Sequence, residues 1–393
     1  MPSGNTSVLI LDGGLGTTLE DIFHRRLGYP LWSATPVDKD PEVIISAHLA
    51  FLRAGADIIL TSTYQASYHT YEIAGYSRED AKRLMLKSVK LAIEAKRGYL
   101  QEITQSDRTD AGLPRSVKIA LSLGPYGGML SPAQEFDGFY PPPFGPTLSS
   151  NTARTNIFEE TENGRHQEVA CVEALADFHY ERLEVFAENR EVWDEIDLVA
   201  FETVPLRREI TGIRKAVAKL QESQNWGPVG QPGEDGAERM KPWWVSTVHP
   251  GGHYPEMKPG GGWVTTGEVA KATLLDEGDR MCTPWGLGIN CTRLEFLPKL
   301  LQEGREVARR AFEVRGVRPW LVLYPNGGDV YNPETHSWEE KGGEGTGWAK
   351  DLWTLVAESS RDEAWGGIVV GGCCKTGPDD ISGLKEGLQK CLE

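Results

Sequence analysis

Eight short, almost continuously apolar runs recur along the chain, and each is followed by a segment with apolar residues at helical spacing. Continuous apolar runs are typical of parallel strands buried on both faces. The predicted strands span 8–11, 56–61, 117–122, 197–201, 243–248, 286–290, 320–324 and 366–370. The predicted helices span 41–53, 77–99, 164–190, 207–220, 265–277, 294–315, 348–360 and 378–392. Strands that alternate with helices predict parallel pairing with right-handed crossovers.

A closed (β/α)8 TIM barrel is the simplest arrangement of these elements, and a doubly wound open sheet is the alternative. Polar or small residues directly follow the strand ends, which form one rim in a barrel, where active sites are built. These residues are Asp12, Thr63, Gly124, Glu202, His249, Cys291, Asn326 and Cys373. We therefore expect one α/β barrel domain over residues 1–393, with surface insertions near 128–163, 221–241 and 331–347.

Composition narrows the class of partner. A formal net charge of −16 disfavours nucleic acid and anionic membranes, because both repel a strongly acidic protein. No apolar run approaches the roughly 18 residues that a membrane span needs, and the first residues carry no secretory signal pattern. Six cysteines in a chain of this length are not a disulfide scaffold. We expect a cytoplasmic protein with reduced thiols.

Three cysteines at two strand ends carry the candidate chemistry. Cys373 and Cys374 follow the last strand directly after Gly371-Gly372, whose conformational freedom would let the chain bend so that both thiols reach one ligand. Cys291 ends a second strand, and one strand separates the two. Three thiolates would form a zinc site with one coordination position open. Two alternatives remain, namely buried thiols without metal and a Cys373-Cys374 redox pair. Cys171, Cys282 and Cys391 are interpreted as incidental.

Other polar residues on the rim have competing roles. Glu202 and Asp12 could bind a substrate cation or act as a base, and Asp12 could instead cap a helix. The glycines of 13–16 offer backbone N–H groups to an anion, although they do not match the dinucleotide pattern. His249 and His253 are an alternative metal pair that we consider weaker, because the residues between them exclude a helix.

Seven ordered motifs, each at a predicted strand end, resemble the homocysteine S-methyltransferase family over nearly the whole chain. They lie at 12–17, 55–59 with 63–67, 122–127, 201–203, 288–292, 324–328 and 371–374. The resemblance implies a zinc-dependent (β/α)8 barrel that methylates homocysteine to methionine. It implies that Cys291, Cys373 and Cys374 are the zinc ligands, through which catalysis proceeds.

The resemblance also implies substrate contacts. Asp12, Gly13 and Glu202 would hold the homocysteine amino group and neighbouring atoms, and Asn290 would line the same pocket. Thr63 is a further expected substrate contact.

The methyl donor is less closely specified. Branches of the family use S-methylmethionine, S-adenosylmethionine, betaine or a methylfolate, and the stretch 63–67 is more similar to the S-methylmethionine branch than to the betaine branch. The chain departs from the family pattern in the loop 249–262, in the insertion 221–236 and at Lys375, where arginine is common. We predict a sulfonium donor, S-methylmethionine or S-adenosylmethionine, at a mouth with the aromatic candidates Tyr64 and Tyr126. The alternatives are a catalytically inactive zinc barrel that binds a thiol amino acid or a partner, and a redox protein.

Overall fold

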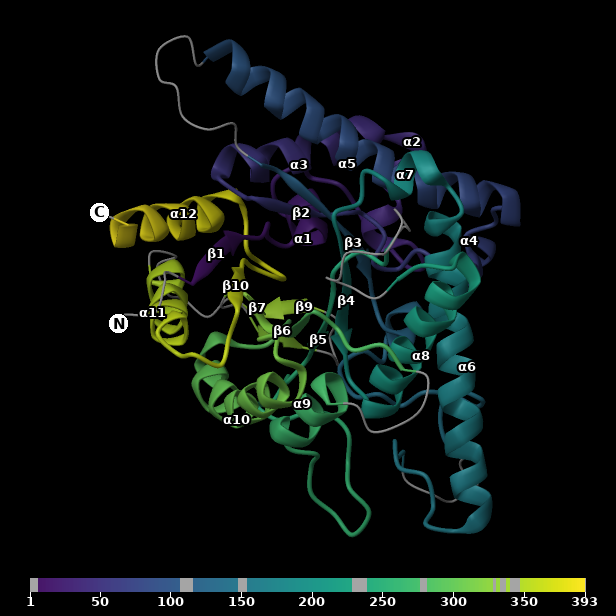
Figure 1. The fold of residues 1–393 in the computed structure, drawn as a ribbon. Helices are drawn as coiled ribbons and strands as arrows, with labels where there is room; N and C mark the ends of the chain where they lie inside the picture. Colours follow the sequence, from purple (N-terminus) through teal and green to yellow (C-terminus); the bar gives the residue numbers. More distant parts are fainter. Residues whose placement is uncertain are drawn as a thin grey trace.

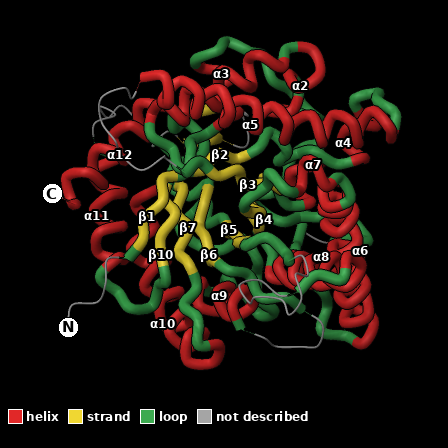
Figure 2. The backbone as a smooth tube through the Cα atoms, turned by 45° about the horizontal axis from the view of Figure 1, so that its top comes forward, coloured by secondary structure: helices red, strands yellow, loops and turns green. Residues whose placement is uncertain are grey.

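The centre of the structure is a sheet of eight parallel strands that curls into a barrel, with helices around its outside (Figures 1 and 2). The computed structural model describes residues 6–106, 116–147, 154–227, 239–275, 281–327, 330–332, 337–339 and 347–392. The strand order is β1-β10-β7-β6-β5-β4-β3-β2. The strands are β1 Ser7–Ile10, β2 Ile58–Leu60, β3 Lys118–Leu123, β4 Leu198–Val204, β5 Trp243–Thr247, β6 Gly286–Asn290, β7 Trp320–Tyr324 and β10 Gly367–Val370. All eight predicted strands are present.

Hydrogen bonds between the first and second strands close the barrel. Leu11 forms a parallel bridge with Ile58. The Asp12 N–H donates to Ile58 O at 3.0 Å, and the Asp57 N–H donates to Ile10 O at 2.7 Å. The predicted closed barrel is therefore confirmed, and the doubly wound open sheet is excluded.

Helices form where apolar residues recur at helical spacing. The predicted helices correspond to α3 Pro41–Ala54, α5 Arg78–Ser106, α6 Glu162–Ala187, α8 Arg207–Gln224, α9 Thr266–Leu274, α10 Leu297–Arg315, α11 Trp348–Ser360 and α12 Pro378–Leu392. Ser77 accepts a hydrogen bond from the Asp80 N–H at 3.1 Å at the start of α5. Among the described residues, no helix has the length and apolar character that a membrane crossing requires.

Several short elements were not predicted. They are α1 Leu15–Asp21, α2 Pro36–Lys39, α4 Tyr68–Ile73, α7 Arg190–Trp193 and the hairpin of β8 Val330–Asn332 with β9 Ser337–Glu339. Elements this short contain too few turns to show a period in the sequence. Of the predicted insertions, residues 148–153, 228–238, 333–336 and 340–346 lie outside the described residues, as does Gly328 of the motif at 324–328.

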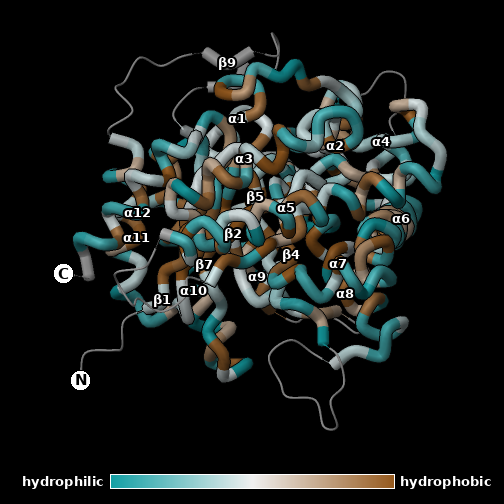
Figure 3. The backbone as a smooth tube through the Cα atoms, turned by 90° about the horizontal axis from the view of Figure 1, so that it is seen from above, coloured by the Kyte–Doolittle hydropathy of each residue, from teal (hydrophilic) through white to brown (hydrophobic). Residues whose placement is uncertain are grey.

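Apolar side chains fill two layers, one between the strands and the helices and one inside the barrel. Hydrophobic and hydrophilic stretches alternate along the outer helices, as expected for helices with one face on the sheet (Figure 3). The interior layer contains two large aromatic residues, Trp244 and Tyr324, among smaller ones such as Ala120 and Ala200. Trp244 Nε1 donates to the Tyr324 hydroxyl at 3.3 Å. This hydrogen bond satisfies an indole N–H that would otherwise be buried without a partner.

One buried imidazole makes stability depend on pH. His48 on α3 is fully buried, and burial lowers its pKa to about 4 from an ordinary value of 6.5. The unfolded chain therefore binds a proton that the folded chain rejects, so stability falls as the pH drops from 6.5 towards 4. Relative to a His48→Leu variant, we expect the wild type to lose about 2 kcal/mol of unfolding free energy between pH 7 and pH 5. Urea denaturation at both pH values measures this difference, and parallel pH profiles would contradict it.

Candidate metal centre at the carboxyl rim

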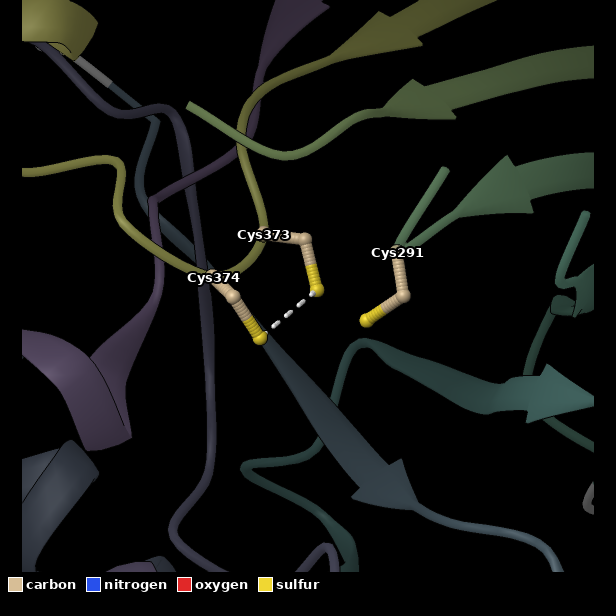
Figure 4. Close-up of side chains that lie close together, drawn as sticks. All are labelled: Cys291, Cys373 and Cys374. Carbon is tan, nitrogen blue, oxygen red and sulfur yellow. Dashed lines mark hydrogen bonds between the residues drawn. The ribbon is translucent and has the colours of Figure 1, made fainter. Parts of the chain in front are cut away.

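Three thiols converge at the carboxyl ends of β6 and β10. The sulfur atoms of Cys291, Cys373 and Cys374 all lie within 4.8 Å of one another (Figure 4). They are free thiols, and the Cys373 and Cys374 sulfurs are 4.0 Å apart. Both strands pair with β7, so one strand separates them as predicted. A tetrahedral site with metal–sulfur bonds of about 2.3 Å places its sulfurs about 3.8 Å apart, so this donor set fits a metal ion that accepts thiolates.

The bend that brings Cys373 and Cys374 to one point depends on missing side chains. A Cβ on Gly371 would lie 2.6 Å from Asp12 O, and one on Gly372 would lie 2.2 Å from Thr376 Oγ1. The Gly372 N–H donates to Asp12 O at 3.0 Å, and the Cys373 N–H donates to Pro325 O at 2.8 Å. Neither glycine has a positive φ. The predicted role of conformational freedom is therefore wrong, and close backbone approach is what requires glycine here.

The position of Cys291 depends on a left-handed backbone conformation and on the neighbouring Asn290, whose side chain is held by hydrogen bonds. Its φ is +47°, in the left-handed region that disfavours side chains. Asn290 accepts from the Thr203 N–H at 2.8 Å and donates to Thr203 Oγ1 at 2.8 Å. The same amide group donates to the sulfurs of Cys291 at 3.4 Å and Cys373 at 3.8 Å. The Asn290 side chain therefore links β4 to two of the three thiols.

Of the three thiols, that of Cys373 loses its proton most readily. Hydrogen bonds from Cys291 and Cys374, together with Asn290, hold the pKa of Cys373 well below its usual value. The hydrogen bonds with Cys373 and Cys374, together with burial, raise the pKa of Cys291. Without a metal ion the cluster thus favours one thiolate held between two thiols, and a cation is needed before all three ionise.

Two buried carboxyl groups lie on the same rim. Asp12 Oδ2 accepts from the Leu60 N–H at 2.8 Å, whereas buried Oδ1 has no hydrogen-bond partner among the described residues. The capping alternative for Asp12 is wrong, because Gly14 occupies the N-cap of α1. Burial, followed by the charge of Glu202, raises the pKa of Asp12 well above its usual value. An arriving cation would be stabilised here.

Glu202 was predicted to follow the fourth strand, but it lies within β4. The strand is longer than predicted because it continues through a register shift between Phe201 and Val204. At this irregularity Thr203 adopts a φ of +59°. Ser122 Oγ donates to Glu202 Oε1, and burial raises the pKa of Glu202 to about 8. Glu202 is 5% exposed, so a charged partner has to approach it from the rim.

The other predicted contacts have protein partners of their own. The Gly14 N–H donates to Thr376 O at 3.0 Å, so it is not free for an anion. Gly13 has no room for a side chain, since a Cβ would lie 2.5 Å from Thr376 O. Thr63 Oγ1 donates to Ser122 O at 2.7 Å, which ties β2 to β3. The predicted substrate contacts of Gly13 and Thr63 stay predictions.

The two histidines of the loop after β5 have separate environments. His249 is buried, its Nε2 lies 3.1 Å from Thr247 Oγ1, and burial lowers its pKa to about 3. His253 stacks on Trp263 with 4.1 Å between the ring centroids. Within the described ranges, the cysteine group is the only one with at least three ligand atoms close enough to hold a metal ion.

A buried arginine that the sequence did not mark as functional holds two rim loops together. Arg182 on α6 donates to Gly124 O at 2.6 Å, Tyr64 O at 2.8 Å and Ala66 O at 2.9 Å. Its guanidinium therefore joins the loop after β2 to the loop after β3. Arginine at one helical position carries no sequence signal for this role. Gly124 at a predicted strand end is a visible feature of the sequence, and the structure explains it, since a Cβ on Gly124 would lie 2.8 Å from the Tyr64 ring.

A neighbouring carboxylate anchors the loop after β3. Glu209 on α8 accepts from the Tyr126 N–H at 2.6 Å, from the Tyr140 hydroxyl at 2.6 Å and contacts His179 Nε2 at 3.0 Å. Tyr126, an aromatic candidate for the donor mouth, stacks on Phe144 with 3.8 Å between centroids. Helices α6 and α8 thus fix the loops after β2 and β3.

The fold and the thiol cluster define a (β/α)8-barrel protein with a candidate metal centre at its carboxyl rim. Residues 9–388 match the sequence model of the family described as homocysteine S-methyltransferase. "Homocysteine S-methyltransferase 2" of Zea mays is 30% identical over 382 residues, which cover 97% of this chain and 90% of that protein. "Selenocysteine Se-methyltransferase" of Brassica oleracea var. italica is 29% identical, with coverage of 96% and 88%.

The metallated form of the homocysteine methyltransferase MmuM from Escherichia coli has a similar structure. Its TM-score is 0.60 at 26% identity, and the match covers 97% of this chain and 96% of that one. The chain therefore belongs to the homocysteine S-methyltransferase family. It is a methyltransferase with a thiol acceptor.

Proposed function

We propose that the protein transfers a methyl group from a sulfonium donor to the thiol of L-homocysteine, giving methionine, with Zn²⁺ bound by Cys291, Cys373 and Cys374. The observation that carries the proposal is the convergence of three thiols from two strand ends within 4.8 Å. When bound by these three cysteines, a zinc ion would lower the pKa of a substrate thiol that it coordinates, so that this thiol would ionise at neutral pH. The ionised thiol would be the methyl acceptor, because a free thiol is mostly protonated at neutral pH and is a poor nucleophile.

The chain's own residues position the acceptor. The carboxyl groups of Asp12 and Glu202 are proposed to receive the homocysteine ammonium group, since Asp12 Oδ1 has no partner among the described residues. Burial disfavours their charged forms until a cation arrives, so an ammonium group recovers free energy that each carboxyl group has lost. Asn290 is proposed to keep the two sulfurs that it contacts in position. Gly13 and Thr63 complete the proposed acceptor site.

Two alternatives are weaker on these observations. A redox pair needs two thiols, yet a third thiol and an amide donor converge on the same point. A binding protein without catalysis would keep the same thiols, and an assay of turnover separates it from the enzyme. Reduced thiols are maintained in the cytoplasm, where we propose that the protein acts as a single barrel domain.

An assay of methionine formation tests the proposal. Purified protein is incubated with homocysteine and S-methylmethionine, S-adenosylmethionine or betaine in parallel, and methionine is measured by mass spectrometry. We expect turnover with a sulfonium donor and none with betaine, together with about one zinc per chain by elemental analysis. If zinc-loaded protein formed no methionine with any donor, the proposed function would be wrong, and the catalytically inactive zinc barrel would be the better interpretation.

A charge change at Glu202 separates acceptor binding from donor binding. Glu202→Gln removes a buried charged hydrogen-bond partner, which is worth about 1.5–3 kcal/mol. The KM for homocysteine should rise about ten-fold or more, whereas the KM for the donor should not change. Glu191→Gln, at an exposed position of α7, is the matched control and should behave as the wild type. Equal changes in both KM values would contradict the acceptor role.

A further inference from the structure

Three buried hydroxyl groups and the carboxyl group of Glu202 form one hydrogen-bonded group across neighbouring strands. Thr61 and Thr63 follow the end of β2, Ser122 lies in β3, and Glu202 lies in β4. None of the four residues is more than 5% exposed. Because water does not compete for these polar atoms, their hydrogen bonds to one another determine how each side chain is oriented.

The two threonine hydroxyl groups hold the backbone of Ser122 on both sides. The Ser122 N–H donates to Thr61 Oγ1 at 3.0 Å, and Thr63 Oγ1 donates to Ser122 O at 2.7 Å. The two threonine oxygens are 2.6 Å apart. A hydroxyl group has one hydrogen, and that of Thr63 is already donated to Ser122 O, so Thr61 donates to Thr63. The three hydrogen bonds therefore close a ring that fixes the position of Ser122.

This ring takes the place of strand pairing beyond the end of β2. The last paired residues of the two strands are Leu60 and Ala120, whereas β3 continues to Leu123. The Thr61 N–H still donates to Ala120 O at 3.0 Å. After that point, hydroxyl groups satisfy the buried backbone groups of Ser122 that a neighbouring strand would otherwise satisfy. A valine at position 61 or 63 would fill similar space but would leave Ser122 without a partner.

The hydroxyl group of Ser122 is the link from this ring to the acceptor site. It donates to Glu202 Oε1. Burial raises the pKa of Glu202 to about 8, and the hydrogen bond from Ser122 acts in the opposite direction because it stabilises the charged form. Among the described residues, no lysine or arginine acts on this carboxyl group. A hydroxyl group held by the backbone of its own residue therefore sets which way the carboxyl group faces.

We propose that Ser122, fixed by Thr61 and Thr63, is a positioning residue that orients the Glu202 carboxyl group for the ammonium group of the thiol acceptor. This assignment rests on the proposed function and adds the residues that support its acceptor site. Thr63 serves that site through Ser122, since its hydrogen is already donated. A carboxyl group that is oriented in advance loses less conformational freedom when the cation binds, so the acceptor binds more tightly.

Ser122→Ala tests the assignment in the zinc-containing protein. The KM for homocysteine should rise about ten-fold, because Glu202 loses the hydrogen bond that orients it. The KM for the methyl donor and the zinc content should not change. Ser88→Ala on α5 is the matched control and should leave all three quantities unchanged, since the buried Ser88 hydroxyl donates within its own helix to Leu84 O at 3.2 Å.

A double-mutant cycle with Glu202→Ala separates positioning from general stabilisation of the barrel. In that background, Ser122→Ala should change the KM for homocysteine by less than about two-fold, because the group through which it acts is gone. An equal factor in both backgrounds would overturn the assignment, as would an unchanged KM for homocysteine in folded Ser122→Ala protein.

The threonine ring provides a second test if Ser122→Ala does not fold, with thermal melting as the measure of folding. Thr63→Val should raise the KM for homocysteine without changing the zinc content, and Thr63→Ser should restore most of the loss because it keeps the hydroxyl group. Equal KM values for the valine and serine variants would also contradict the assignment. Failure of the proposed function is distinguishable, because the wild type itself would then form no methionine with any donor.

Discussion

Replacing Cys373 with alanine should abolish zinc binding and turnover together. Cys373 has the most acidic thiol of the cluster and receives hydrogen bonds from Asn290 and the other two cysteines. Its loss leaves two thiols, which do not complete a site with three protein ligands. We expect zinc per chain to fall below a tenth and methionine formation to fall by roughly a thousand-fold or more, because an uncoordinated thiol is mostly protonated at neutral pH. Elemental analysis and mass spectrometry measure the two losses.

The control for this variant is Cys282→Ala. The Cys282 thiol donates to Gln221 Oε1, away from the cluster, so its removal should leave zinc content and turnover unchanged. A Cys373→Ala protein that is free of zinc and still active would refute the chemistry proposed for the site.

Replacing Arg182 with methionine should give the second largest effect, on stability. The guanidinium is fully buried and donates to carbonyl groups of two rim loops. Burial lowers its pKa to about 9, so it stays charged at neutral pH. Methionine keeps most of the volume but removes the Arg182 donor from Gly124 O and Ala66 O, at about 1–3 kcal/mol each, whereas Tyr64 O keeps the Gly124 N–H. We expect the unfolding free energy to fall by about 3 kcal/mol or more in chemical denaturation.

An exposed arginine provides the comparison. Arg190→Met removes a partly solvated ion pair with Asp194, in which both side chains are mostly exposed, and should cost less than about 1 kcal/mol. An unfolding free energy equal to that of Arg190→Met would contradict the anchoring role.

The sequence predicts most of the barrel, because buried parallel strands and amphipathic helices have strong periods. It also identifies the thiol cluster, since cysteines at strand ends one strand apart must meet at the rim. The carboxyl groups of Asp12 and Glu202 are also identified from their places after predicted strands, and the resemblance to a known family adds Asn290 and the expected contact with homocysteine. The structure places all three residues at the same rim as the cysteines.

What the sequence does not predict depends on tertiary packing. The extension of β4 through Glu202 follows from a register shift, which leaves no period in the sequence. The bend at Gly371-Gly372 depends on close contact of Gly371 with Asp12, which is far away along the chain, and of Gly372 with the nearby Thr376. Arg182 and Glu209 act through backbone groups of distant loops, so no local motif marks them.

X-ray absorption at the zinc edge tests the central claim most directly, because it counts the sulfur atoms bound to the ion. The account predicts three sulfur ligands at about 2.3 Å and one lighter ligand in the protein alone. On addition of homocysteine the count should rise to four sulfurs. Protein that contains no zinc, or whose sulfur count stays the same with saturating homocysteine, would contradict the account.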